Sequence, residues 1–325
     1  FVMQVSLPAR AQQPAAAPAP IESIPLPKQG KQVLNASGVV PLADSRFLIC
    51  DNRTNDALFE LTVGPAGESA GPLVRRPVVV KGGYLLEDME DLTLAETPEG
   101  RYLFISTSLS VKKASKKSQG APVARPGGLI RIKYTETGPL EAEVIPEFRD
   151  WLIKRFAKNA AVGSLEPDKG GLNVEGLAWD PARSALLVGV RSPVGEGVAY
   201  VAPIKIPDVS DHWSASHLEA LPLLRVQTGA TTVPLGIRGI EYDAGRRAFL
   251  VILGNAYSGG DAPFQLCLWD GQDATALKRF EGVTFVASAK PEGVSTGVVA
   301  GKPVIVIADD SGGYRVLTDD DVRPQ

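Results

Sequence analysis

The sequence predicts an all-β protein, folded as a single β-propeller of five four-stranded blades. One observation behind this prediction is a pattern of strands and turns that repeats five times along the chain. A second is the spacing of the repeats, roughly 50 residues, which suits four antiparallel strands in one propeller blade. A third is the content of 33 Gly and 26 Pro in 325 residues, which is typical of many short strands joined by turns.

Each repeat begins with a polar step that contains Gly or Asp, continues into a strand, turns, and enters a strongly apolar strand. The residue before the Gly or Asp is the anchor of the repeat. The five anchors are Ser37, Glu90, Glu175, Arg238 and Glu292, separated by 53, 85, 63 and 54 residues. The turns inside the repeats read ADSR, TPEG, DPARS, DAGRR and VAGK, which favour tight hairpins.

A third strand follows each apolar strand, and a fourth strand follows in four of the repeats. The fourth strands read VRRPVVV, EAEVIPE, EALPLLRV and LKRFEGV. The fifth repeat ends near Asp319 without one, whereas the segment 21–28 (IESIPLPK) precedes the first repeat and has no partner there. We therefore expect segment 21–28 to supply the missing strand and close the ring, which removes exposed sheet edges.

The interval of 85 residues between the second and third anchors leaves a six-bladed propeller open as an alternative. We expect a helical insertion there instead, because segment 146–161 has apolar residues at 148, 151, 152 and 156, the spacing of an amphipathic helix. A pair of β-sandwiches is the alternative to a propeller, but sandwich strands do not usually repeat with an anchor step.

Composition and the amino-terminal segment bear on the compartment. The chain has 34 basic and 37 acidic residues, which argues against a nucleic-acid-binding protein, and no apolar run is long enough to span a membrane. Ala9-Arg10-Ala11 has the form of a signal-peptidase site. We therefore expect residues 1–20 to be a signal-peptide remnant and an Ala/Pro spacer, residues 21–325 to be the propeller, and the protein to be periplasmic or secreted.

The two cysteines, Cys50 and Cys267, lie in separate apolar runs. Buried free thiols are the preferred interpretation, and a disulfide is left open because the sequence gives no distance between them. The chain has no Cys or His cluster for zinc.

The anchors should gather at one mouth of the central channel. In a propeller the innermost strand of each blade lines the channel, and each anchor lies at the start of that strand. Because strand direction alternates, the loops between second and third strands reach the same mouth. These loops are residues 51–57, 106–128, 191–198, 254–263 and 309–313. Long polar loops on a rigid scaffold often carry function, so we expect the functional site here.

Carboxylates at this mouth predict a metal site. Glu90, Glu175 and Glu292 would point toward a common axis. Asp51, Asp309 and Asp310 end second strands nearby. Two carboxylates about 6 Å apart repel by roughly 3 kcal/mol at an effective dielectric constant of about 20, so the cluster should take up protons or a cation. Oxygen ligands without Cys or His favour a hard ion, above all calcium.

Cationic residues at the same mouth allow two interpretations. Arg191 and Arg238 could neutralise the glutamates in a purely structural network of ion pairs. Together with Arg53 and Lys290, they could instead bind a small anionic substrate that carries a phosphate or carboxylate. The chain has no nucleophile-elbow, Walker or dinucleotide-binding motif, so no catalytic residue is predicted from a motif.

Three repeats resemble a known family. NVEGLAWDP with LLVGVRSP, GIRGIEYD with FLVILG, and KPEGV with VIVIADD look like the bacterial propellers called domain of unknown function 3616. The resemblance covers residues 35–318. The family name implies a propeller fold and no established activity.

The Glu-Gly steps are also similar, more distantly, to the β-propeller phytases with their esterase-like relatives, and to the gluconolactonase and regucalcin group. Both groups use calcium held by carboxylates at the starts of inner strands, which implies Glu90, Glu175 and Glu292 as ligands. This chain departs from that pattern at Ser37 and Arg238. The phytase DDPAIW-type step and the His pair of paraoxonase-type lactonases are both absent.

Two hypotheses follow for the function. The first is a secreted, calcium-dependent hydrolase of phosphate esters or lactones. The second is a non-catalytic propeller that binds a ligand or protein partner at the same mouth, with the carboxylates and arginines in a closed network. The sequence does not decide between them, and it leaves the oligomeric state open.

Overall fold

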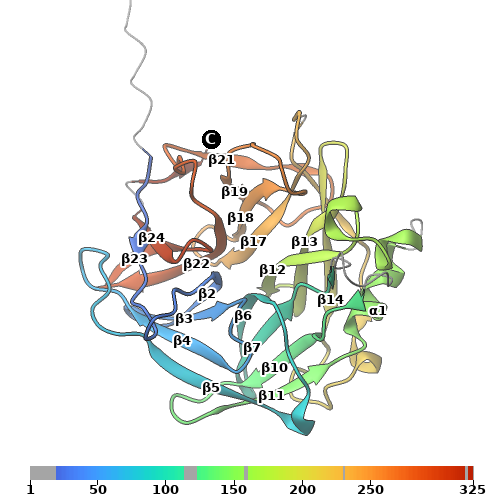
Figure 1. The fold of residues 1–325 in the computed structure, drawn as a ribbon, viewed down its shortest axis with the longest axis horizontal. Coiled ribbons are helices and arrows are strands. Elements are labelled where there is room, and N and C mark those ends of the chain that lie inside the picture. Colours follow the sequence, from blue (N-terminus) through green and yellow to red (C-terminus); the bar gives the residue numbers. More distant parts are fainter. Residues whose placement is uncertain (1–19, 113–122, 157–159, 230, 319–320, 325) are drawn as a thin grey trace, which may run out of the picture.

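The computed structural model describes residues 20–112, 123–156, 160–229, 231–318 and 321–324. In this part of the chain the strands form five blades around a common centre (Figure 1). The fold is therefore all-β and propeller-like, as the repeat predicts. Residues 1–19, which hold most of the expected signal-peptide remnant and spacer, lie outside the described residues. None of the described helices is long and apolar enough to cross a membrane.

The first two blades follow the predicted strand order from the channel outward. Blade 1 consists of β2 (Ala36–Ala43), β3 (Arg46–Asp51), β4 (Ala57–Thr62) and β5 (Val74–Val80). Blade 2 consists of β6 (Met89–Thr97), β7 (Gly100–Thr107), β10 (Leu129–Lys133) and β11 (Leu140–Ile145). The outer strands β5 and β11 pair in parallel, which joins the two blades into one continuous sheet.

The next two blades carry small additions to the same pattern. Blade 3 consists of β12 (Asn173–Asp180), β13 (Ala185–Gly195), β14 (Val198–Lys205) and β16 (Leu224–Gln227). Blade 4 consists of β17 (Leu235–Asp243), β18 (Ala248–Asn255), β19 (Gln265–Trp269) and β21 (Lys278–Glu281). The short strands at their edges are β15 (Glu219–Ala220), β20 (Thr275–Ala276) and β25 (Arg323–Pro324).

Blade 5 confirms the predicted closure of the ring. It consists of β22 (Pro291–Val299), β23 (Lys302–Asp309), β24 (Gly313–Thr318) and the amino-terminal β1 (Ile24–Pro25). Strand β1 pairs antiparallel with β24, with Ile24 opposite Tyr314. The paired strand is shorter than the predicted segment 21–28, although Ile21 adds an isolated bridge to Phe285.

The inner hairpins have the turn chemistry that the sequence predicts. In the turn between β22 and β23, Ala300 has φ 49° and Gly301 has φ 75°. Two successive residues with positive φ match the twist of the flanking strands, and Gly adopts such a φ without steric cost.

Each apolar strand contributes side chains to two hydrophobic clusters, one on each side of its blade. In β3, Phe47 and Ile49 belong to the cluster shared with blade 5, whereas Leu48 and Cys50 belong to the cluster shared with blade 2. This alternation is the two-residue period of a strand. Corresponding clusters lie between the other neighbouring blades. Each fully buried aliphatic or aromatic side chain contributes about 1.5–3 kcal/mol, so the ring is held by its blade-to-blade contacts.

The cysteines are both buried and free. Cys50 and Cys267 belong to different hydrophobic clusters, the first between blades 1 and 2 and the second between blades 3 and 4.

A helical insertion fills the long interval before blade 3, as predicted. It contains α1 (Phe148–Ile153) and short 3₁₀ turns at Lys154–Phe156, Ala160–Gly163 and Pro167–Lys169. Phe148 and Leu152 of α1 are fully buried in the cluster between blades 2 and 3. Residues 157–159 of the predicted span lie outside the described part.

Candidate functional site

Each of the five anchors lies at a β-bulge of its innermost strand. In blade 1, Ala36 pairs with Asp51 and Gly38 pairs with Cys50, so Ser37 is left without a pairing partner. The strand pairing shifts register in the same way at the other anchors, namely Glu90, Glu175, Arg238 and Glu292. A bulge re-aims the side chain of its extra residue, and bulges are common beside functional sites.

The residue after each anchor lets neighbouring inner strands approach closely. A Cβ on Gly239 would lie 1.9 Å from the Glu292 carbonyl oxygen, and one on Gly293 would lie 2.7 Å from the Gly38 Cα. Asp91 replaces this glycine in blade 2, and its Oδ2 accepts a hydrogen bond from the Leu177 amide of blade 3 at 2.8 Å. The close approach brings the anchors of neighbouring blades together at one mouth.

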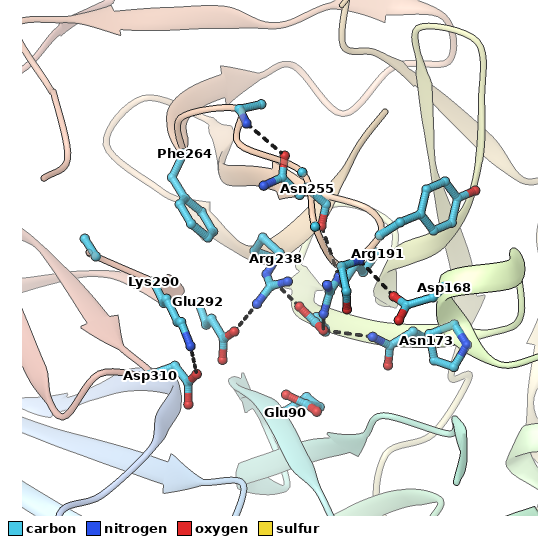
Figure 2. Close-up of a pocket in the computed structure, with 18 of the residues that line it drawn as sticks. Glu90, Asp168, Asn173, Arg191, Arg238, Asn255, Phe264, Lys290, Glu292 and Asp310 are labelled. Carbon is cyan, nitrogen blue, oxygen red and sulfur yellow. Dashed lines mark hydrogen bonds and ion pairs between the residues drawn. The ribbon is translucent and has the colours of Figure 1, made fainter. Parts of the chain in front are cut away.

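A pocket of about 1070 Å³ lies at this mouth, and all five predicted loops contribute to its lining (Figure 2). The acidic side chains that line it are Asp88, Glu90, Asp168, Glu175, Asp261, Glu292 and Asp310. The cationic side chains that line it are Arg125, Arg191, Arg238 and Lys290. Polar and aromatic side chains complete the wall, among them Asn173, Asn255, Tyr257, Phe264 and Phe285.

Arg238 lies at the centre of an ion-pair network. Its Nε is 2.7 Å from Glu175 Oε2, and its other side is paired with Glu292. All three side chains are almost fully buried. Burial alone would lower the pKa of Arg238, but the charges of Glu175 and Glu292 raise that pKa above its ordinary value, so the guanidinium stays charged.

Glu175 has a second cationic partner. Arg191 Nη1 donates a hydrogen bond to Glu175 Oε1 at 2.9 Å, and Asn173 Nδ2 donates to the same oxygen at 2.8 Å. The Arg191 Nε in turn donates to the carbonyl oxygens of Asn255 and Ala256, at 3.1 and 3.2 Å. These contacts fix Arg191 against blade 4 and give Glu175 a second positively charged partner.

Glu90 differs from the other anchors of the same charge. It is 7% exposed and lines the pocket, yet its carboxyl group has no hydrogen bond or ion pair with any described residue. Figure 2 shows it standing below Arg238 with no marked interaction. Burial, together with the negative charge of Glu175, raises the pKa of Glu90 well above its usual range.

Two further carboxyl oxygens beside the pocket lack partners among the described residues. Glu292 Oε2 and Asp310 Oδ1 are both buried without a hydrogen bond. Burial raises the pKa of Glu292 to about 8, although Arg238 opposes the rise. Burial also raises the pKa of Asp310, whose Oδ2 is 3.7 Å from Lys290 Nζ. Buried polar atoms without partners are rare in folded proteins.

Three of the predicted site residues are absent from this pocket's lining. Asp51 and Asp309 are buried at the ends of β3 and β23, and each accepts a hydrogen bond from the loop that follows its strand. Asp51 Oδ1 accepts from the Asn35 amide at 2.8 Å, and Asp309 Oδ2 is 2.5 Å from Arg315 Nη1. Arg53 also lies outside the lining. Backbone and arginine donors at the strand ends hold the two aspartates away from the pocket.

The structure adds residues that the sequence did not single out. Asp168 reaches the pocket from the 3₁₀ turn Pro167–Lys169 at the end of the helical insertion. Its Oδ1 accepts from the Ser258 amide of blade 4 at 2.8 Å. Asn255, Tyr257 and Phe264 come from the end of β18 and the loop after it. Asn255 and Tyr257 lie in the predicted loop 254–263. No motif marks Asp168, because it joins the pocket only when the insertion packs against blade 4.

The donor set does not form a ready metal site. Among the described residues, no three His, Cys, Asp or Glu side chains are grouped so that they could hold an ion. The Arg238 guanidinium lies between Glu175 and Glu292 and already supplies their positive charge. Calcium bound by Glu90, Glu175 and Glu292 stays a prediction.

Comparisons with known proteins give no family. No family model and no curated protein sequence matches the chain. Similar solved structures include a candidate oxidoreductase (glucose dehydrogenase) from Thermus thermophilus, with 13% identity, a TM-score of 0.42, and coverage of 91% of this chain and 98% of that one. Another is a protein of unknown function from Dyadobacter fermentans, with 10% identity, a TM-score of 0.43, and coverage of 93% and 84%.

A glycosyl hydrolase from Bacteroides ovatus is similar at 11% identity and a TM-score of 0.38, with coverage of 97% of this chain and 95% of that one. At these values the similarities assign neither a family nor an activity. The order and pairing of its own strands identify the chain as an all-β, propeller-like protein.

Proposed function

We propose that this protein binds a small polar organic molecule in the pocket at the channel mouth. One observation carries the proposal: Glu90 lines the pocket, is more than nine-tenths buried, and has no partner among the described residues. A buried carboxyl group without a hydrogen-bond partner is costly. A bound ligand that donates hydrogen bonds to Glu90 would remove this cost.

The rest of the pocket is suited to such a role. Its volume of about 1070 Å³ is at the upper end of small-molecule sites. The Arg238 and Arg191 contacts hold Glu175 and Glu292 in fixed positions, so little side-chain freedom has to be lost on binding. Preorganisation of this kind favours affinity because it lowers the entropic cost of binding.

The experiment is a crystallographic screen of a few hundred chemically diverse fragments, read out by where they bind. We expect hits to concentrate in the channel-mouth pocket and to contact Glu90. Wild-type protein and Glu90→Gln would be soaked in parallel, with Glu196→Gln as the control, since Glu196 is exposed and outside the lining. A screen that leaves this pocket without hits while others fill would contradict the proposal.

A calcium-dependent hydrolase is the second candidate. The observation in its favour is that Glu292 Oε2 and Asp310 Oδ1 are buried without a hydrogen bond, beside a Glu90 carboxyl group that has no partner among the described residues. A calcium ion there would polarise the phosphoryl or carbonyl oxygen of a phosphate ester or lactone. Arg191 and Lys290 line the same pocket and would bind the anionic group of the substrate.

The hydrolase has a separate test. Calcium should raise the unfolding temperature in a concentration-dependent way, and turnover of a panel of phosphate esters and lactones should stop when a chelator is added. A protein that shows neither response to calcium, magnesium or manganese is not such an enzyme.

We also propose that the chain belongs to the family called domain of unknown function 3616. We further propose that the protein is exported to the periplasm or the medium. The Ala9-Arg10-Ala11 site that supports export lies outside the described residues. Sequencing the amino terminus of the protein recovered from the periplasm and the medium would test export, because cleavage should remove the residues before the spacer.

A further inference from the structure

The pocket is lined by more acidic than basic side chains. Among the described residues, its lining holds seven Asp or Glu side chains and four Lys or Arg side chains. A pocket lined mainly by one sign of charge concentrates ligands of the opposite sign. The charges therefore favour a cationic ligand.

The cations of the pocket are also engaged already. Arg238 is shared by Glu175 and Glu292, and Arg191 is paired with Glu175. Lys290 lies beside Asp310, and Arg125 lies 3.2 Å from Asp88. An anionic ligand would have to displace carboxylates from these partners, whereas a cationic ligand would displace nothing.

The carboxyl groups of the pocket, in contrast, keep oxygens that no described cation or donor contacts, and these oxygens are acceptors when the groups are ionised. Glu292 Oε2 and Asp310 Oδ1 are buried without a hydrogen bond. The carboxyl group of Glu90 has no hydrogen bond or ion pair with a described residue, and all three residues line the pocket. They come from blades 2 and 5 and from the loop after β23. Their common requirement is a donor of several hydrogen bonds with a positive charge.

An ammonium group meets this requirement more readily than a metal ion does. It offers three donors, and it needs only hydrogen-bond contacts to two or three oxygens. Calcium needs six to eight oxygen ligands at about 2.3–2.6 Å, whereas an ammonium group can be satisfied by two of these carboxyl groups.

The remaining wall suits the carbon skeleton of an organic molecule. Tyr257, Phe264 and Phe285 line the pocket, and aromatic side chains supply large apolar contact surfaces. Asn173 and Asn255 add amide groups to the same wall.

We propose that the ligand of this pocket is an organic amine whose amino groups bind among the carboxyl groups of Glu90, Glu292 and Asp310, with its carbon skeleton against the aromatic side chains. This inference rests on the proposed function and narrows it to one chemical class. It differs from the anionic substrate that the sequence predicts, because the cations expected to bind an anion are paired with carboxylates.

The test uses trios of probes that share a skeleton and differ in charge, such as benzylamine, benzyl alcohol and benzoate. Binding to the full chain is measured by isothermal titration calorimetry at constant ionic strength. We expect the amines to bind at one site, at least about tenfold more tightly than the matched alcohols, because hydrogen bonds to charged groups are the stronger ones. The carboxylates should bind most weakly.

Variants locate the binding site. Asp310→Asn and Glu90→Gln should each weaken amine binding by about tenfold and leave the weak binding of the alcohols unchanged. Two variants are used because Asp310 is only partly buried, so its substitution tests the proposal even if the more buried Glu90→Gln folds poorly. Glu196→Gln removes one exposed carboxylate outside the lining and should change nothing.

Each outcome has a distinct meaning. Alcohols or carboxylates that bind in this pocket as tightly as the amines would overturn the inference and leave the proposed function standing. Calcium that binds more tightly than the amines and displaces them would also overturn it, in favour of the second candidate. If no fragment of any charge occupies the pocket, the proposed function itself falls.

Discussion

At the scale of single residues, Arg238 compensates the negative charges of the buried carboxylates at the channel mouth. Its repeat has arginine at the anchor position where three other repeats have glutamate. The guanidinium contacts Glu175 of blade 3 and Glu292 of blade 5, so one side chain of blade 4 links both of its neighbours. Two buried carboxylates that would repel each other are thus held by a shared cation.

We expect Arg238→Met to lower the free energy of unfolding by about 3–5 kcal/mol, because removal of one partner of a buried ion pair leaves the other charges uncompensated. Urea unfolding followed by tryptophan fluorescence measures the change. Arg225→Met is the control, since Arg225 pairs with Asp273 at the surface, and it should leave the urea midpoint unchanged. Equal midpoints for the two variants would contradict the role assigned to Arg238.

Glu241 gives the cleanest pH-dependent contribution to stability. It is buried on β17, where Thr93 Oγ1 donates a hydrogen bond to its Oε2 at 3.2 Å. Burial raises its pKa from the ordinary 4.5 to about 8. The folded state therefore binds a proton that the unfolded state releases, so this contribution is complete below pH 4.5 and is lost as the pH rises through about 8.

We expect the free energy of unfolding of the wild type to fall with rising pH between these two values, with a slope of up to about 1.4 kcal/mol per pH unit from this group. The Gln side chain of Glu241→Gln has nearly the same shape and does not titrate. In this variant the free energy of unfolding should therefore fall less steeply with pH, by up to the same slope. Unfolding measured in urea at intervals of one pH unit gives the comparison, and Glu196→Gln should follow the wild type. Parallel curves for wild type and Glu241→Gln would show that Glu241 titrates normally.

At the scale of structural elements, the bulge and the residue after it form the unit that builds the mouth. The bulge changes the direction of the anchor side chain. The residue after the anchor lets the inner strand of the neighbouring blade approach closely. Gly239 is the clearest case, because its Cα is packed against the backbone of the neighbouring blade. The glycine in this step therefore serves packing between blades, and its backbone does not adopt a positive φ.

We expect Gly239→Ala to destabilise the protein by about 3 kcal/mol, since a Cβ there would lie 1.9 Å from the Glu292 carbonyl oxygen and the two strands would have to separate. Gly71→Ala is the matched control, because a Cβ on Gly71 meets nothing within 4 Å. Thermal unfolding of both variants gives the comparison. The mouth geometry described above would be wrong if Gly239→Ala were as stable as Gly71→Ala.

At the scale of the whole molecule, the ring is closed by a segment from the opposite end of the chain. Strand β1 completes blade 5 by pairing with β24, and neighbouring blades share hydrophobic clusters. Stability is therefore distributed around the ring, and opening it at one blade exposes the edge of β24.

We expect deletion of residues 21–28 to lower the unfolding temperature and to cause self-association, because an unpaired strand edge is a template for pairing with another chain. Light scattering and calorimetry measure the two effects. A synthetic peptide with the sequence of residues 21–28, added to the deletion variant, should reverse both by adding the strand back. A deletion variant that stays monomeric and unfolds like the wild type would show that closure by β1 contributes little.

The sequence by itself determined the blades, the closing strand, the helical insertion and the end of the channel where the anchors gather. These features follow from local patterns: a repeated step, hairpin turns, strand alternation and an unpaired segment at each end. A repeat constrains where its parts lie because every copy must fold in the same way. The presence of Glu90, Glu175 and Glu292 at one pocket was therefore within reach of sequence analysis.

Only the tertiary structure decided which charges are partners. Asp51 and Asp309 resemble channel ligands in sequence, yet they are bonded within the loops that follow their strands. Asp168 belongs to the pocket although no pattern marks it. Ion pairs and hydrogen bonds depend on distances of a few tenths of an ångström. Such distances between residues far apart in the chain are set by bulges and by packing between blades, which a one-dimensional pattern does not contain.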